Sequence, residues 1–349
     1  MRTFVASAVY VSLAAGIFAQ QPNGEDPAGQ VAFRNRQVRL VDSYRNSGDY
    51  PAAERVLRTW IASEPAGSAS RLMIQIALAD LLREEGRNAE ARQLFVQSVN
   101  SPAVTSQRRL DALMGLADVD LRQGDWKTSV NEWNAALEIA RFRKDTASET
   151  IGLRGLGHAW LQAGSPARAE PLLRQSLKMA ESDPAAAPLE VAASLGAMAE
   201  YYRAENKLAL AEDAWTRALA IERTAFGESH PQVAILMEML SDVYSERGES
   251  GLARDYATCA ADVMRQWFGE DSPASATALA NLALVEQRAH TLGAAANHYE
   301  TAVRVLRRSP ELRPTLKIVM ERYAAVLKAM HRDREAKALD TEVKAFRPN

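Results

Sequence analysis

The feature that most constrains the fold of this chain is an internal repeat. The hexamer Phe-Gly-Glu-Ser-His-Pro at residues 226–231 returns as Phe-Gly-Glu-Asp-Ser-Pro at residues 268–273, 42 residues later. A similar spacing of 38 to 42 residues separates eight expected turn residues, which are Gly48, Gly86, Gly124, Gly164, Asn206, Gly248, His290 and His331. Repeats of this length indicate an array of small units, and a chain of 349 residues is too long for one compact core.

Two columns of small residues recur at fixed distances from these turns. Five residues after the turn stand Ala53, Ala91, Ser129, Ala169, Ala211, Ala253, Ala295 and Ala336. Seven residues before it stand Ala79, Ala117, Gly157, Ala199, Ser241, Ala283 and Ala324, with Val41 as the exception in the first unit. Small residues repeated on both sides of a turn are typical of two helices that cross closely.

Larger side chains recur nine residues after the turn and four residues before it, and these would pack against neighbouring units. Alanine and leucine dominate the hydrophobic residues, which make up 47% of the chain, and this composition favours helix. No single helix pair could bury its apolar face alone. The sequence therefore predicts an all-α fold, a right-handed superhelical α-solenoid of about eight antiparallel helix pairs.

The repeated hexamers have the chemistry of a helix end followed by a helix start. Gly227 and Gly269 can adopt the left-handed conformation that ends a helix. Ser229 or His230 can cap the next helix in the first hexamer, as Asp271 or Ser272 can in the second, and Pro231 and Pro273 fit a first helical turn.

These motifs resemble the tetratricopeptide repeat family, and the units after about residue 190 resemble its kinesin light chain subtype. The likeness rests on Ala-Leu-Ala-Ile-Glu at 218–222, the hexamer at 226–231, Leu-Ser-Asp-Val-Tyr at 240–244 and Asn-Leu-Ala at 281–283. It covers roughly residues 34–346. The resemblance implies a protein that binds a peptide or another protein, without indicating which partner.

The domain organisation follows from the repeat and from the two ends of the chain. Residues 1–19 form an apolar run after Met1-Arg2, which is typical of a secretory signal peptide cleaved after Ala19. Residues 20–33 are expected to be a flexible lead. Units 1–4 are predicted at 34–181, a Pro/Ala-rich join at 182–190, and units 5–8 at 191–346.

The signal peptide predicts a periplasmic or secreted protein from a bacterium, with no membrane span after cleavage. The alternatives are an uncleaved N-terminal anchor, for which the apolar run is short, and a cytoplasmic protein whose N-terminus only imitates a signal. The formal net charge of −2 gives no global attraction to nucleic acid. Oligomeric state has no signal in the sequence.

A column of acidic residues lies six residues before the turns, on the first helices that would line the concave surface. It contains Asp42, Asp80, Asp118, Glu200 and Asp242, with His158 in the fourth unit, and arginines follow three residues later at Arg45, Arg83 and Arg203. We predict that these nine residues form a groove for a peptide. The alternative is a solvated helix face, stabilised by weak ion pairs within each helix.

No pattern of catalytic, cofactor or metal-binding residues stands out. Gly152, Gly155 and Gly157 imitate a glycine-rich loop, but their spacing does not fit a dinucleotide turn, and Gly157 belongs to a small-residue column. The five histidines include no pair four residues apart, and Cys259, beside the packing residue Ala260, is expected to be a buried thiol. We therefore expect no cofactor, no metal and no catalysis.

The sequence thus favours an exported scaffold or adaptor that binds a protein or peptide on its concave face. A cytoplasmic helical regulator is the second hypothesis. An enzyme with an unrecognised site is the third, and it would need a pocket in which titratable groups converge.

Overall fold

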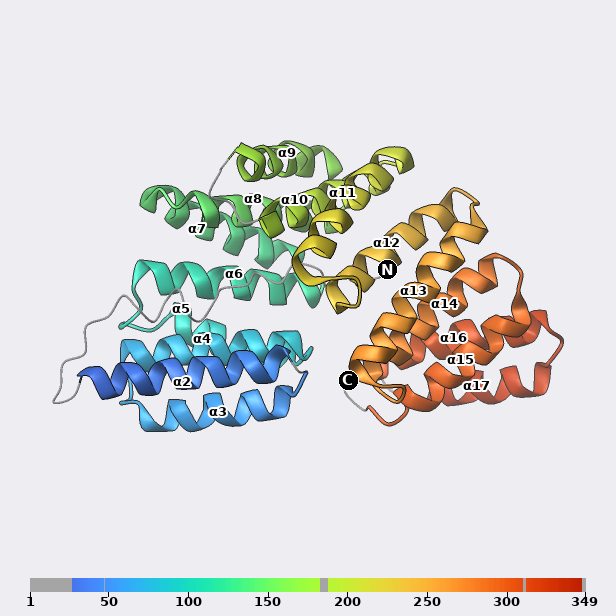
Figure 1. Cartoon of the computed structure of the whole chain (residues 1–349), viewed down its shortest axis with the longest axis horizontal. Helices are drawn as coiled ribbons and strands as arrows, with labels where there is room; N and C mark the ends of the chain where they lie inside the picture. Colours follow the sequence, from blue (N-terminus) through green and yellow to red (C-terminus); the bar gives the residue numbers. More distant parts are fainter. Residues whose placement is uncertain (1–26, 47, 183–187, 310–311, 347–349) are drawn as a thin grey trace. The chain divides into compact units, whose positions relative to one another are not determined.

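The computed structural model describes residues 27–46, 48–182, 188–309 and 312–346, and this part of the chain contains 16 α-helices and no strand (Figure 1). The predicted signal peptide at 1–19 and the lead up to residue 26 lie outside the described residues. None of the described helices is long and apolar enough to cross a membrane.

The helices form eight consecutive pairs. The first helices of the pairs are α2 (Pro27–Asn46), α4 (Ala69–Glu84), α6 (Ser106–Arg122), α8 (Thr146–Gln162), α10 (Pro188–Ala204), α12 (Pro231–Glu246), α14 (Pro273–Arg288) and α16 (Arg313–Ala329). The second helices are α3 (Tyr50–Ser63), α5 (Asn88–Val99), α7 (Trp126–Arg143), α9 (Pro166–Ser182), α11 (Leu208–Phe226), α13 (Ser250–Phe268), α15 (Leu292–Leu306) and α17 (Asp333–Ala345). The predicted solenoid of antiparallel helix pairs is confirmed.

The chain divides into two compact units, residues 1–186 and 187–349. The N-terminal unit contains α2 to α9 and the C-terminal unit contains α10 to α17. Within each unit every helix packs against the next one along the chain. Direct contacts also join α4 to α6 and α6 to α8 in one unit, and α12 to α14 in the other, so successive first helices approach one another more closely than successive second helices do.

The first helix begins earlier than the sequence analysis expected. Helix α2 starts at Pro27, so residues 27–33, which were assigned to the flexible lead, are helical. Proline fits a first helical turn, and the residues that follow it continue the helical pattern. Phe33 packs its ring edge against Trp60 of α3, with ring centroids 6.4 Å apart.

All eight expected turn residues adopt positive φ angles and separate the two helices of a pair. Gly48, Gly86, Gly124, Gly164 and Gly248 have φ between 68° and 86°, while Asn206, His290 and His331 have φ of 56°, 59° and 60°. A left-handed residue lets the backbone reverse immediately after a helix, and glycine does this without strain. The spacing pattern therefore located every turn.

Both columns of small residues are buried at the crossing of each pair. All eight residues of the column after the turn have no exposed surface. Ser129 Oγ donates to the carbonyl oxygen of Ala117 at 2.7 Å, and Ser241 Oγ donates to that of Ala253 at 2.6 Å. Each bond joins one column to the other, so the two small columns face each other as predicted.

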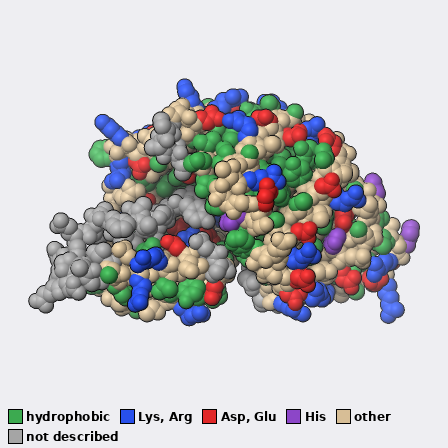
Figure 2. Space-filling model, viewed as in Figure 1, with side chains coloured by type: hydrophobic (Ala, Val, Ile, Leu, Met, Phe, Trp, Pro, Cys, Tyr) green, Lys and Arg blue, Asp and Glu red, His purple; other side chains and the backbone are tan. Residues whose placement is uncertain are grey.

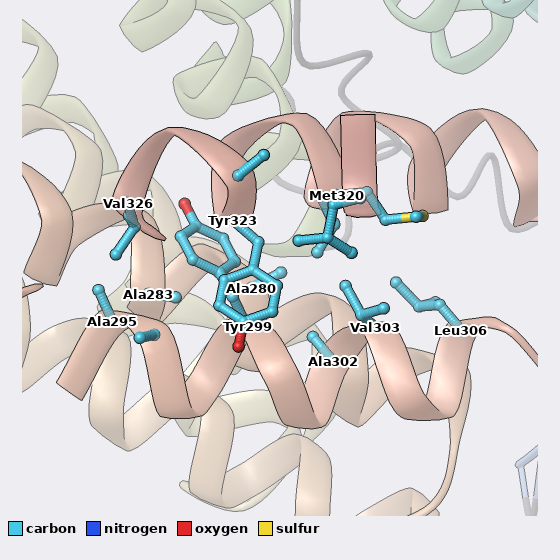
Figure 3. Packing of buried hydrophobic residues seen from close by; sticks show 14 of the residues in the cluster. Ala280, Ala283, Ala295, Tyr299, Ala302, Val303, Leu306, Met320, Tyr323 and Val326 are labelled. Carbon is cyan, nitrogen blue, oxygen red and sulfur yellow. The ribbon is translucent and has the colours of Figure 1, made fainter. Parts of the chain in front are cut away.

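Large side chains fill the space between successive pairs. Tyr299 of α15 and Tyr323 of α16 lie side by side with ring centroids 6.2 Å apart, next to Ala280 and Ala283 of α14 (Figure 3). Tyr299 is completely buried. Small residues at the crossing and aromatic residues between pairs thus build one continuous core from α14 to α17.

The repeated hexamers end one helix and begin the next, with one difference from the prediction. His230 Nδ1 accepts from the backbone N–H of Gln232, Ser272 Oγ accepts from that of Ser275, and each following proline occupies the first helical turn. Gly227 and Gly269 have φ of 82° and 86°, but their ψ angles of 167° and 161° are extended. The chain therefore leaves the helix in a conformation open essentially to glycine alone, instead of the left-handed helical one.

The three glycines of α8 are explained by packing. A Cβ atom on Gly155 would lie 2.3 Å from Trp133 Cζ2, and one on Gly157 would lie 2.4 Å from a methyl carbon of Leu173. A Cβ on Gly152 would lie 2.9 Å from a methyl carbon of Leu137. Because these glycines have no Cβ atom, they leave room for side chains of the flanking helices α7 and α9.

Candidate interaction surface

The predicted groove residues all lie on first helices. In the N-terminal unit Asp42 belongs to α2, Asp80 to α4, Asp118 to α6 and His158 to α8. In the C-terminal unit Glu200 belongs to α10 and Asp242 to α12. We call the surface formed by these residues, with Arg45, Arg83 and Arg203, the first-helix surface, and describe it separately in each unit.

Arg83 is the centre of this surface in the N-terminal unit. Its side chain is 2% exposed and donates to Asp118 Oδ2 of α6 at 2.7 Å and to Asp80 Oδ1 of its own helix at 3.2 Å. Arg122 Nε also donates to Asp118 Oδ2, at 2.8 Å. One arginine on α4 therefore ties together two members of the acidic column on successive first helices.

The two carboxylates of this cluster differ in their electrostatics. Burial raises the pKa of Asp80 to about 6, and the positive charge of Arg83 offsets only part of that effect. Burial also acts on Asp118, but Arg83 and Arg122 more than offset it and hold the pKa of Asp118 below its usual value. Asp118 is therefore a fixed anion, whereas Asp80 is closer to taking up a proton.

Arg45 makes a similar link one pair earlier. Its guanidinium donates through Nε and Nη2 to Glu84, an acid of α4 that lies outside the predicted column. Asp42 lies close enough for Arg45 to lower its pKa in part, although burial raises that pKa overall.

In the C-terminal unit, other residues make similar links between successive first helices. Arg203 of α10 donates to Glu246 Oε1 of α12, with the shortest contact at 2.8 Å. Asn281 Nδ2 of α14 donates to Glu238 Oε2 of α12 at 2.8 Å, and Arg288 Nη1 donates to Ser245 Oγ at 3.3 Å. Asp242 is 2% exposed, so the backbone and its neighbours cover it almost completely.

The polar groups of the first helices are therefore joined mainly between helices. The expected pair within one helix is present at Asp80 and Arg83, but Arg45 and Arg203 bind acids on the following first helix. Sequence reasoning missed Glu84 and Glu246, although both stand two residues before a turn. An acid two residues before the turn recurs at Glu84 and Glu246, and this recurrence is the signal that could have identified them.

A second polar cluster lies between helices α5, α6 and α7, with the buried Asp120 at its centre. Asp120 is 1% exposed and accepts from Arg92 Nε at 2.6 Å and Nη2 at 3.1 Å. Burial, with the adjacent charge of Asp120, raises the pKa of Glu132 to about 8. At neutral pH the Glu132 carboxyl is therefore mostly protonated.

Cys259 is exposed on α13, so the expectation of a buried thiol was wrong. Successive residues on a helix point about 100° apart, and the burial of Ala260 therefore says little about its neighbour. Within the described residues no group of three or more His, Cys, Asp or Glu side chains is placed to hold a metal ion. Acidic and basic side chains are interspersed over the visible face of the described surface (Figure 2).

The fold and this surface define the class of protein, an α-solenoid of repeated helix pairs. Residues 190–266 match the tetratricopeptide repeat model. This match and the helix-pair fold support an assignment to the tetratricopeptide repeat family. No curated protein matches it.

Several solved structures share the fold at low identity. A Rap protein complexed with competence and sporulation factor is 13% identical, with a TM-score of 0.67 over 93% of this chain and 87% of its own. NprR in complex with its cognate peptide NprX is 13% identical, with a TM-score of 0.57 over 90% and 89%. BtubC (BKLC) from P. vanneervenii is 19% identical, with a TM-score of 0.53 over 69% and 94%.

Proposed function

We propose that this protein is an exported, non-enzymatic scaffold that binds a peptide or a protein segment on its first-helix surface. The proposal rests on the polar side chains of the first-helix surface. Arg83, Asp118 and their neighbours are held in place by bonds between helices, so hydrogen-bonding groups stand pre-ordered in rows. Two solved proteins of similar fold hold a peptide or a factor, which supports the same use here.

The paired charges indicate how such a ligand would be held. Asp118 already receives two arginine donors, so a cationic side chain of a ligand would gain little by approaching it. Carboxylate oxygens keep further lone pairs, which can accept backbone N–H or amide donors. The surface therefore favours recognition by many hydrogen bonds along an extended or helical segment over a few strong ion pairs.

Capture of binding partners from the envelope fraction tests this function. The test variant changes Asp80 and Asp118 to Asn and Glu200 to Gln, because these substitutions keep the shape of the side chains and remove their charge. The control changes the exposed acids Glu138, Asp213 and Asp255 of second helices in the same way. We expect the test variant to lose the partners that the control retains. Equal recovery by both variants would leave the first-helix surface without a role in binding.

Export is a second part of the proposal, and it rests on the apolar run of residues 3–19. We expect N-terminal sequencing of the protein from its native host to begin at Gln20, after cleavage behind Ala19. A chain that begins at Met1 in the soluble cytoplasmic fraction would favour a cytoplasmic regulator instead. That result would leave the role of the first-helix surface untouched.

A further inference from the structure

Helix α2, the first of the described helices, exposes residues at positions that are covered in the other first helices. Eight residues before the turn stand Leu78 in α4, Leu116 in α6 and Leu156 in α8, and they are 2%, 5% and 5% exposed. In the C-terminal unit Leu240, Leu282 and Tyr323 hold the same position and are 0%, 4% and 6% exposed. Leu40 is their counterpart in α2, and it is 37% exposed.

The cover over the other residues is the second helix of the preceding pair. Leu78 belongs to one cluster with Leu57 and Trp60 of α3, and Leu116 lies in that cluster with Phe95 of α5. Helix α2 has no preceding pair among the described residues. Phe33, which lies on the same side two turns earlier, is 45% exposed.

We call the side of α2 that carries Phe33, Arg36, Leu40 and Ser43 the N-terminal face. Arg36 and Ser43 stand where α4 has the buried Ile74 and Leu81, so the face is partly polar. Arg36 and Arg39, at its edge, are exposed and form no ion pair with any described residue. The face thus combines two exposed apolar side chains with two exposed arginines that pair with no acid of the described residues.

We propose that the N-terminal face is a docking surface for an amphipathic helix of a protein partner that carries acidic residues beside its apolar stripe. We infer that the partner contributes a helix, because a second helix covers the equivalent position in the other pairs. We infer that this helix is acidic, since Glu or Asp beside its apolar stripe would compensate the charge of Arg36 and Arg39. This surface is separate from the first-helix surface, and neither proposal depends on the other.

Other occupants fit less well. A second copy packed face to face would place its Arg36 and Arg39 near those of the first copy, with no acid to compensate them. Residues 20–26, Gln-Gln-Pro-Asn-Gly-Glu-Asp, carry acids but no large apolar side chain that could cover Leu40. An acidic amphipathic helix from another protein satisfies both the apolar and the charged groups.

Fluorescence anisotropy with designed probes tests the proposal on the full chain. The probes are two labelled helical peptides of about 18 residues with one leucine stripe, flanked by Glu in one peptide and by Lys in the other. We expect saturable binding of the acidic probe that weakens with added salt. Leu40→Asp combined with Phe33→Ser should weaken it at least tenfold, and Arg36→Glu combined with Arg39→Glu should weaken it severalfold.

Matched controls lie at the other end of the chain. Ile318 on α16 is 43% exposed, and Arg334 on α17 is exposed, so Ile318→Asp and Arg334→Glu should leave probe binding unchanged. Circular dichroism confirms that each variant folds. Equal affinity of the Leu40→Asp variant, or equal binding of the basic probe, would overturn the proposal.

Two further results would show that something else covers the N-terminal face, and either result would overturn the proposal. Self-association in sedimentation that Leu40→Asp abolishes would identify a second copy. Binding by a chain that begins at Pro27, but by neither the full chain nor the chain that begins at Gln20, would identify residues 20–26 as the cover.

Discussion

Gly155 shows how a single residue sets the distance between two helices. Replacing it with Ala would place a Cβ atom 2.3 Å from the indole of Trp133, which is 3% exposed and has little room to move. We expect Gly155→Ala to destabilise the protein by about 1–3 kcal/mol, because overpacking forces rings and backbone to shift. Thermal unfolding measures this effect.

Gly196 of α10 is the matched control for that prediction. It is also helical, but nothing lies within 4 Å of the Cβ that alanine would add. Gly196→Ala should be neutral or stabilising, by up to about 1 kcal/mol, because alanine favours helix over glycine. A Gly155→Ala variant as stable as Gly196→Ala would show that the packing at Trp133 does not require a glycine.

Glu132 makes stability depend on pH. Its pKa rises from 4.5 to about 8 on folding, because it is buried beside Asp120. The unfolded chain therefore loses this proton before the folded one does, and stability falls as the pH rises from about 4.5 to 8. Glu132→Gln should remove this slope and raise the melting temperature at pH 7 to 8.

The control for the pH prediction is Glu138→Gln, an exposed position on the same helix. It should leave both the melting temperature and its pH dependence unchanged. An unaltered pH profile in the Glu132→Gln variant would contradict the raised pKa of Glu132.

At the scale of elements, Arg83 joins two first helices through buried charge. Replacing it with Met removes the guanidinium that Arg83 of α4 places against Asp80 and Asp118, and leaves the charge of these two carboxylates with less compensation. We expect Arg83→Met to destabilise the protein by about 3–5 kcal/mol, as other losses of one partner from a buried ion pair do.

The half-exposed pair of Arg203 and Glu246 provides the comparison, since their side chains are 29% and 30% exposed. Arg203→Met should cost no more than about 1 kcal/mol, because water competes for the same charges. If both variants lost the same stability in denaturant unfolding, burial of Arg83 would not be what makes its contacts strong.

The elements were predictable from the sequence, and their side-chain partners were not. Turn positions such as His290 followed from spacing alone, because a close helix pair needs a reversal at a fixed distance from its small residues. The pairing of Arg45 with Glu84 depends on the register between two helices, which the pattern within one helix does not contain. For the same reason Asp118 was placed on its surface correctly while its link to Arg83 was missed.

At the scale of the whole molecule, the ends of the array differ from its interior. Positions that α15 fills with the buried Ala296 and Val303 hold Lys337 and Lys344 in α17, so the last helix presents charge where another pair would pack. Helix α2, the first of the described helices, has the exposed Leu40 on its outer side. Among the described helices, α17 therefore carries charge on the side where α2 carries an exposed leucine.

We have proposed that the first-helix surface holds a protein or peptide partner. Site-specific photocrosslinking in the native host tests it most directly, with the photoreactive residue at position 80 or 200 on first helices and at 138 or 213 on second helices. We predict that positions 80 and 200 each yield a crosslinked partner and that positions 138 and 213 yield none. Crosslinks confined to positions 138 and 213 would contradict the claim.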